Sequence, residues 1–362
     1  MGMAVPAAMD GREARATLVG ASVVVAFTLA VLATGRVPLA QFAQLFGIYA
    51  GGTVAVWTVL GVITFFVQVF RSARVSRGEP FLGAMVGEFI AGRWRRDRFA
   101  SLLWPPLMFA TLLASFNSFK QQVLPLAGFH FDAAFAAGDR MLFLGQDPWR
   151  VTHAILGSDR AILAVDRLYH GWFAPMMIGV ILCAWLPASS YRLRTQYLLS
   201  YISVWILLGS VLAFLFPSAG PCFYSELVGP APQFDALLQR LHDVEAATGS
   251  PLLALHNQAT LLHAFHNDRL ALGGGISAMP SVHNGLAVLF AIASWRVSKP
   301  LGTLFAAYGG IIWIGSIHLG WHYALDGIVA AVLTAGIWRF CGRIAERLER
   351  PLLPAPTAPA LA

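Results

Sequence analysis

The sequence predicts an all-α fold, a polytopic bundle of helices that crosses a membrane several times. Of the 362 residues, 57% are hydrophobic and only 12% are charged, which is more apolar than a soluble chain of this length needs to be. The apolar residues form long uncharged stretches, and about 20 such residues cross a bilayer as a helix. A helix satisfies its own backbone hydrogen bonds in hydrocarbon, whereas an open strand does not.

Eight stretches of this kind follow one another along the chain. They lie at residues 17–35, 46–70, 99–119, 169–188, 196–217, 280–297, 301–318 and 322–340. The first follows Arg12 and Arg15, as a secretory signal would, but its apolar run is longer than a signal peptide's and we expect an uncleaved helix. We therefore divide the chain into two N-terminal membrane helices with an Arg-rich cytoplasmic segment (1–98), a membrane domain that carries the chemistry (99–345) and a disordered tail (346–362).

The distribution of basic residues predicts the orientation, because short loops rich in Lys and Arg stay in the cytoplasm. If eight helices alternate, the basic segments share one side: Arg12 with Arg15, 71–98, Arg192 with Arg194, Arg296 with Lys299, and 339–350. Both termini of this cell-membrane protein are then cytoplasmic. The net charge of +7 comes mostly from arginines beside helix ends, which anionic lipids attract, so we expect membrane lipids and not nucleic acid as partners.

Two long segments lie on the predicted outer side and are expected to cap or line the mouth of the bundle. Residues 120–168 contain a predicted short helix near Asp132 to Phe143. Residues 218–279 contain a helix-like stretch around Phe234 to Ala247 and end in a glycine run.

The segment SAMPSVHNG places His283 at the outer start of the sixth helix. Pro280 suits the first position of a helix, because its φ is preset and it has no N–H to leave unpaired. The amides of Ser281, Val282 and His283 would then lie at the positive end of a helix dipole, where a phosphate binds well. The glycines at 273–275 would let the backbone approach closely.

The segment GWHYALDG supplies a candidate nucleophile. His322 and Asp326 are four residues apart and are expected on one face of a helix. A carboxylate that holds the proton of one ring nitrogen leaves the other with a free lone pair, which can attack phosphorus and form a phosphohistidine. His283, brought opposite, would protonate the leaving oxygen and then activate the acceptor. Asp326 lies in an otherwise apolar helix, where an ionisable group is costly and usually functional.

SAMPSVHNG and GWHYALDGIVA resemble the second and third signature motifs of the type 2 phosphatidic acid phosphatase superfamily. They are most similar to its inositol phosphorylceramide synthase-like branch, which has MPS-x-H and H-Y-x-x-D. The resemblance continues through FNSFKQQVLP, the Asp132 and Asp139-Arg140 region with DPW, DRLYHGWF and FPSAGPCFY, over about residues 100–340. It implies a six-helix core, metal-independent catalysis without a cofactor, His322 as nucleophile supported by Asp326, His283 as acid and base, and Ser281 with its neighbouring amides on the phosphate.

Two departures from that family concern its arginines. Lys120 is not followed, six residues on, by the Arg-Pro of the first motif, and Ser316 stands where many members have Arg in the third. A phosphoryl transition state normally needs fixed cations. The basic residues on the predicted outer side are Lys120, Arg140, Arg167 and Arg269. Lys120, Arg140 and Arg269 are our predicted phosphate ligands, and anchoring at the membrane interface is the alternative role.

Two rival interpretations remain. His318, His322 and Asp326 are spaced four residues apart and would form a metal-ligand stripe, with His283 as a fourth ligand, in a membrane metallohydrolase. Gly320 argues against it, since the helix then begins after His318. A non-enzymatic lipid transporter is the second rival, although no discontinuous helix pair or internal repeat is evident.

The sequence therefore predicts a membrane enzyme that takes a phosphoryl or phospho-headgroup from a lipid phosphate at the outer leaflet. With water as acceptor it is a phosphatase, and with a lipid or polyol hydroxyl it is a phosphotransferase. The motifs leave the acceptor, the lipid and the oligomeric state open.

Overall fold

The computed structural model describes residues 11–75, 99–184, 190–267 and 270–349. This part of the chain is helical and contains no strand, which confirms the predicted all-α fold. Five helical segments are long and apolar enough to cross a membrane. They belong to α1 (Gly11–Ala33), α2 (Leu39–Val75), the continuous run of α9 (Tyr191–Ser203), η3 (Val204–Leu212) and α10 (Ala213–Leu215), α15 (Lys299–His318) and α16 (Ala324–Glu349).

The other three predicted spans are also helical. They correspond to α4 (Phe99–Gln122), α8 (Phe173–Ala184) and α14 (Val282–Val297). The described part of α8 has 12 residues, or about 18 Å, and ends where the described range ends. The helix α14 has 16 residues, or about 24 Å, which is less than the roughly 30 Å hydrocarbon core. It is therefore shorter than the stretch of 280–297 predicted from hydropathy.

The apolar surface of the long helices fits a membrane protein. Leu18, Val54 and Phe70 are large apolar side chains of α1 and α2, and each has more than half of its surface exposed. Contact of such side chains with lipid tails has no free-energy cost, whereas their contact with water is unfavourable. The chain is thus an integral membrane protein with a helical bundle.

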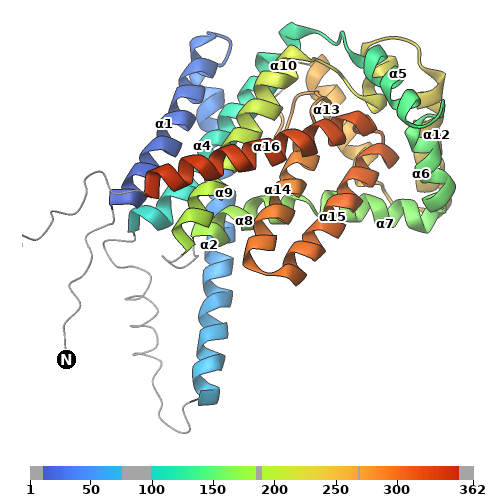
Figure 1. The fold of residues 1–362 in the computed structure, drawn as a ribbon. Coiled ribbons are helices and arrows are strands. Elements are labelled where there is room, and N and C mark those ends of the chain that lie inside the picture. The colour runs from blue at the N-terminus through green and yellow to red at the C-terminus, as the bar shows by residue number, and fades with distance from the viewer. Residues whose placement is uncertain (1–10, 76–98, 185–189, 268–269, 350–362) are drawn as a thin grey trace, which may run out of the picture.

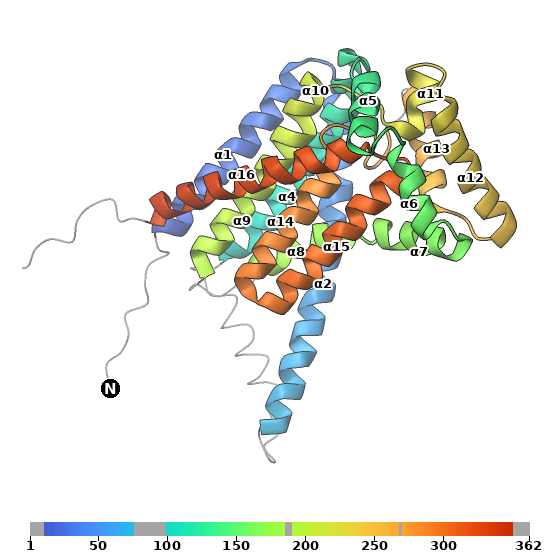
Figure 2. The same cartoon turned by 45° about the vertical axis from the view of Figure 1, so that its right-hand side comes forward.

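The helix α14 lies at the centre of the bundle and packs against α15, α16 and α9, while α2 packs against α4. Five shorter helices gather at one end, beside the end of α15 and the start of α16 (Figures 1 and 2). They are α5 (Asp132–Leu142), α6 (Pro148–Leu156), α7 (Asp159–His170), α12 (Pro232–Thr248) and α13 (Leu253–His266). The predicted short helices near 132–143 and 234–247 are confirmed as α5 and α12.

A stretch of π-helix, η3, stands inside the fifth predicted span and lies next to the start of α14. Gly209 of this stretch occupies a position where a Cβ would come within 2.6 Å of Phe116 and 2.9 Å of Val282. Only glycine lets the first turn of α14 approach so closely. Wide turns of this kind often accompany functional sites.

Three earlier predictions fall on residues outside the described ranges. They are most of the Arg-rich cytoplasmic segment (76–98), most of the tail (350–362) and Arg269.

Candidate active site

The start of α14 is held by Ser281 and not by Pro280. The Ser281 hydroxyl accepts a hydrogen bond from the amide of Asn284 at 3.3 Å, so Ser281 is the N-cap and the helix begins at Val282. The prediction that Pro280 takes the first helical position is wrong by two residues, because a serine cap satisfies the helix end better. The Ser281 amide donates to the carbonyl of Asp326 at 3.3 Å. Within the described residues, the amides of Val282 and His283 have no hydrogen-bond partner and are available to a ligand.

The turn between α15 and α16 presents His322 before the helix and not within it. The helix α15 ends at His318, and Gly320 reverses the chain with a φ of +77°. Because α16 starts at Ala324, the prediction that His322 and Asp326 share a helix face is wrong for His322. Asp326 instead reaches back and accepts the Tyr323 amide at 3.0 Å, which is one half of a capping box.

The two acceptors around His322 fix its tautomer. Its Nδ1 lies 2.9 Å from the carbonyl oxygen of Ala278 and 3.2 Å from Oδ2 of Asp326. Neither oxygen carries a hydrogen, so Nδ1 is the donor and Nε2 keeps a lone pair. Asp326 is fully buried, and 7% of the His322 surface is exposed. The ring is therefore both oriented and reachable.

His283 lies beside His322, as the sequence predicts. The two ring centroids are 5.9 Å apart, with 57° between the ring planes. The His283 ring also contacts Trp172 at 4.2 Å and stacks on Tyr169 at 5.4 Å. The first turn of α14 and the α15–α16 turn thus bring His283, His322 and Asp326 together.

Asp139 of α5 holds the first turn of α16. Its two carboxylate oxygens accept the amides of Ala324 at 2.8 Å and Leu325 at 2.9 Å. These amides are thereby occupied, so a phosphate in this site has the start of α14 available and not the start of α16. Burial raises the pKa of Asp139 to about 6, although both amide bonds favour its charged form.

Asp132 of α5 holds the neighbouring loop. It accepts the amides of Ala219 at 2.8 Å and Gly220 at 2.9 Å, and the Tyr323 hydroxyl donates to it at 2.8 Å. Neither Asp132 nor Asp139 is assigned a role by the motifs of the sequence. Their spacing of seven residues places them on one face of a helix, and this signal was available.

A comparison with known protein families shows to which family the chain belongs. Residues 133–340 match the PAP2 superfamily. The chain belongs to the PAP2 superfamily. No curated protein and no solved structure matches it. PAP2 members are phosphoesterases, so this is an enzyme with a phosphatase-type function on a lipid phosphate.

The matched PAP2 region contains His283, His322 and Asp326, whereas Lys120 lies before it. Lys120 occupies the last turn of α4 and is half-buried. Among the residues that the structure describes, no carboxylate forms an ion pair with it, and its charge acts on His283. Gly275 has a φ of +89°, and a Cβ there would lie 2.5 Å from the Lys120 carbonyl oxygen. Gly275 therefore allows contact with α4, and the close approach of the glycine run to a phosphate stays a prediction.

The predicted phosphate ligand Arg140, and Arg167 of the same predicted outer side, are placed differently from Lys120. Arg140 donates from Nε to Asp147 at 2.7 Å, and 42% of its side chain is exposed. Arg167 donates to the carbonyl of Pro251 at 2.8 Å. Both guanidinium groups thus have protein partners.

His318 makes its contacts with α6, away from the other two members of the predicted metal stripe. Its Nδ1 lies 3.1 Å from the Thr152 hydroxyl, and its ring lies 4.0 Å from that of His153. Across the described ranges, no three His, Cys, Asp or Glu side chains are grouped as a metal would require. The arrangement of His318 therefore lends no support to the metallohydrolase.

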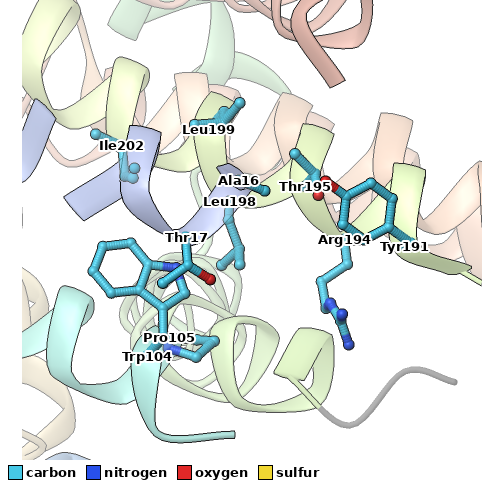
Figure 3. Close-up of a pocket in the computed structure, with 11 residues that line it drawn as sticks. Ala16, Thr17, Trp104, Pro105, Tyr191, Arg194, Thr195, Leu198, Leu199 and Ile202 are labelled. Atoms are coloured by element: carbon cyan, nitrogen blue, oxygen red, sulfur yellow. The ribbon is translucent and has the colours of Figure 1, made fainter. Parts of the chain in front are cut away.

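Two cavities flank α4 at its opposite ends. One lies between the starts of α1, α4 and α9, has a volume of about 30 Å³ and contains none of the predicted site residues; Trp104 and Thr195 line it (Figure 3). The other has a volume of about 460 Å³ and lies beside Lys120, with Arg36, Gln121 and Gly275 in its wall. Of these two cavities, the second is the larger, but neither is lined by His283, His322 or Asp326.

Proposed function

We propose that this PAP2 protein transfers a phosphoryl group from a lipid phosphate at the outer leaflet through a phosphohistidine on His322. The observation that carries the proposal is the pairing of His322 Nδ1 with the Ala278 carbonyl and Asp326, which leaves Nε2 as a nucleophile. The outward orientation rests on the basic loops of the opposite side.

The reaction has two balanced steps. In the first, Nε2 of His322 attacks phosphorus, the bond from phosphorus to the lipid oxygen breaks, and His283 gives its proton to that oxygen. In the second, His283 takes the proton of the acceptor hydroxyl, whose oxygen attacks phosphorus, and the electron pair of the P–N bond returns to Nε2. The distance of 5.9 Å between the two ring centroids would let both histidines contact one phosphoryl group. No metal enters either step.

Asp326 stabilises the positive ring that forms when Nε2 bonds to phosphorus, because its buried carboxylate is already in contact with Nδ1. The phosphoryl oxygens bind the amides of Val282 and His283 at the start of α14. Lys120 supplies the cation, since no carboxylate in the described residues pairs with it. A role for Arg140 requires that it leave Asp147, and a role for Arg269 stays a prediction.

The acceptor decides between a phosphatase and a phosphotransferase. The helices α12 and α13 contribute to a layer over the site, which would shield the phosphohistidine from water and favour transfer. Membership of the inositol phosphorylceramide synthase-like branch stays a prediction from the MPS-x-H and H-Y-x-x-D spacings.

The test uses the purified full chain in detergent with a panel of radiolabelled lipid phosphates. We expect label on the wild-type protein in acid-labile form, turnover that survives a chelator, and neither in His322→Ala. The control is His256→Ala, because His256 is an exposed histidine of α13. Full turnover in His322→Ala would refute the phosphohistidine, chelator-sensitive turnover would favour a metal enzyme, and lipid transport without turnover would favour a transporter.

A further inference from the structure

A second histidine near the site is oriented in the same way as His322. Nδ1 of His170 lies 2.8 Å from the carbonyl oxygen of Asp166 and 3.3 Å from its Oδ1. In both histidines Nδ1 donates to a backbone carbonyl and to a carboxylate, and the carboxylate belongs to the residue four positions away in the chain. His170 therefore also presents Nε2 as a hydrogen-bond acceptor.

The carboxylate behind His170 is rigidly placed. Asp166 is fully buried and accepts the amides of Leu253 and Ala254, each at 2.9 Å, at the start of α13. The His170 side chain is 10% exposed. Within the described residues its Nε2 has no hydrogen-bond partner, although Nδ1 has two acceptors. The orientation of the His170 ring is therefore fixed, and its Nε2 is available to accept a hydrogen bond from a ligand.

His170 belongs to the junction of α7 and α8, which lies against the proposed acid and base. Its neighbours Tyr169 and Trp172 contact the His283 ring at 5.4 and 4.2 Å. His170 itself contacts the ring of Trp321, the residue before His322, at 6.5 Å. We call Tyr169, His170, Trp172 and Trp321 the junction cluster.

The other members of the junction cluster carry unused donors. The Tyr169 hydroxyl and the Nε1 atoms of Trp172 and Trp321 are buried and lack a hydrogen-bond partner in the part of the chain that the structure describes. Unpartnered buried donors are costly and uncommon in native proteins. The three donors and one acceptor of the junction cluster match a ligand with hydroxyl groups, which both donate and accept hydrogen bonds.

We propose that the junction cluster is the binding site for the acceptor of the phosphoryl group. An O–H of the acceptor other than the one that reacts donates to Nε2 of His170, and acceptor oxygens receive hydrogen bonds from the three free donors. His170 binds and orients the acceptor, while His283 takes the proton as the acceptor oxygen attacks phosphorus. The site serves the second step of the proposed reaction and therefore rests on the proposed function. Its ligand is a hydroxyl compound, either water or an alcohol.

The test separates formation of the phosphoenzyme from its decay. Full-length protein in detergent is labelled with a radioactive lipid phosphate, then chased with buffer alone or with glycerol, and inorganic phosphate and glycerol phosphate are counted. His170→Phe keeps a ring but loses Nε2, whereas His170→Gln keeps an acceptor oxygen. The matched control is His256→Phe, at an exposed position of α13.

We expect the decay of the phosphoenzyme, relative to its formation, to slow about tenfold in His170→Phe, as for one lost hydrogen bond to a neutral group. His170→Gln should retain most of the decay rate. A slower chase with glycerol alone identifies an alcohol site, and a slower chase in both arms identifies a site that also binds water.

Three results would overturn the acceptor site. The first is a decay rate in His170→Phe equal to that of His256→Phe. The second is an equal slowing of formation and decay in both His170 variants, which indicates a structural role. The third is the absence of label on the wild-type protein, which refutes the proposed function and the acceptor site with it, whereas the first two leave the phosphohistidine intact.

Discussion

The pH dependence of stability is a direct test of how Asp139 holds the turn before α16. Asp139 is 3% exposed, and burial raises its pKa from 3.8 to about 6 despite two amide hydrogen bonds. The folded protein therefore keeps this proton over a pH range in which the unfolded chain has lost it. The stabilisation of the folded state by this retained proton is fully present below pH 3.8, and it is lost as the pH rises through about 6.

The size of the effect follows from the two pKa values. A rise from 3.8 to about 6 corresponds to about 3 kcal/mol of unfolding free energy between the two limits. Asp139→Asn cannot titrate, so this part of the pH dependence should vanish from the variant. Other buried carboxylates, such as Asp132, also titrate, and only the difference between wild type and variant isolates Asp139.

The assay is denaturant unfolding of purified protein in one detergent at several pH values between 4 and 7.5. We expect the advantage of the wild type over Asp139→Asn to shrink as the pH rises. The control is Asp243→Asn, at an exposed position of α12. A flat difference for Asp139→Asn would contradict the reasoning, because the amides of α16 would then keep the carboxylate ionised throughout.

The remaining predictions concern contacts around the site. Gly275→Ala should destabilise the protein by about 2 to 4 kcal/mol in thermal unfolding, because the backbone is left-handed and the new Cβ meets the Lys120 carbonyl. Gly145→Ala is its control, since the φ is +88° with no atom within 4 Å, and an equal loss would remove the argument from contact. Asp326→Asn keeps an acceptor oxygen without the charge, so labelling of His322 in rapid-quench experiments should slow at least about tenfold; an unchanged rate contradicts this. Lys120→Met should raise KM for the lipid phosphate more than Lys120→Arg, and equal KM values would exclude a role for its charge.

The local chemistry of the site could be predicted from the sequence because its residues lie within short motifs. His283 follows a helix-start signal, and His322 and Asp326 are four residues apart. The helix starts were less predictable, since they depend on contacts that the motifs do not contain. Asp139, 185 positions away, caps Ala324 and thereby sets where α16 begins.

The second hydrogen-bond acceptor of His322 shows why the complete site could not be predicted from the sequence. The Ala278 carbonyl that fixes the tautomer together with Asp326 is a backbone atom, and any residue type supplies one. The tertiary fold alone brings it to Nδ1. By contrast, the pairing of Arg140 with Asp147 is local, because the two residues are seven positions apart in the chain. That contact was predictable and would have argued against Arg140 as a phosphate ligand.

Four buried carboxylates lie around the candidate site, and each of them accepts at least one backbone amide. Asp132, Asp139, Asp166 and Asp326 accept amides from the loop after α10, from α16, from α13 and from Tyr323. These carboxylates are held mainly by backbone amides, and within the described residues none of them forms an ion pair with Lys120, which fits the proposed role of Lys120 at the phosphate. The same bonds tie the orientation of His322 and His170 to the docking of α5, α7 and α13. Loosening of these helices should therefore abolish phosphoryl transfer before the membrane bundle itself unfolds.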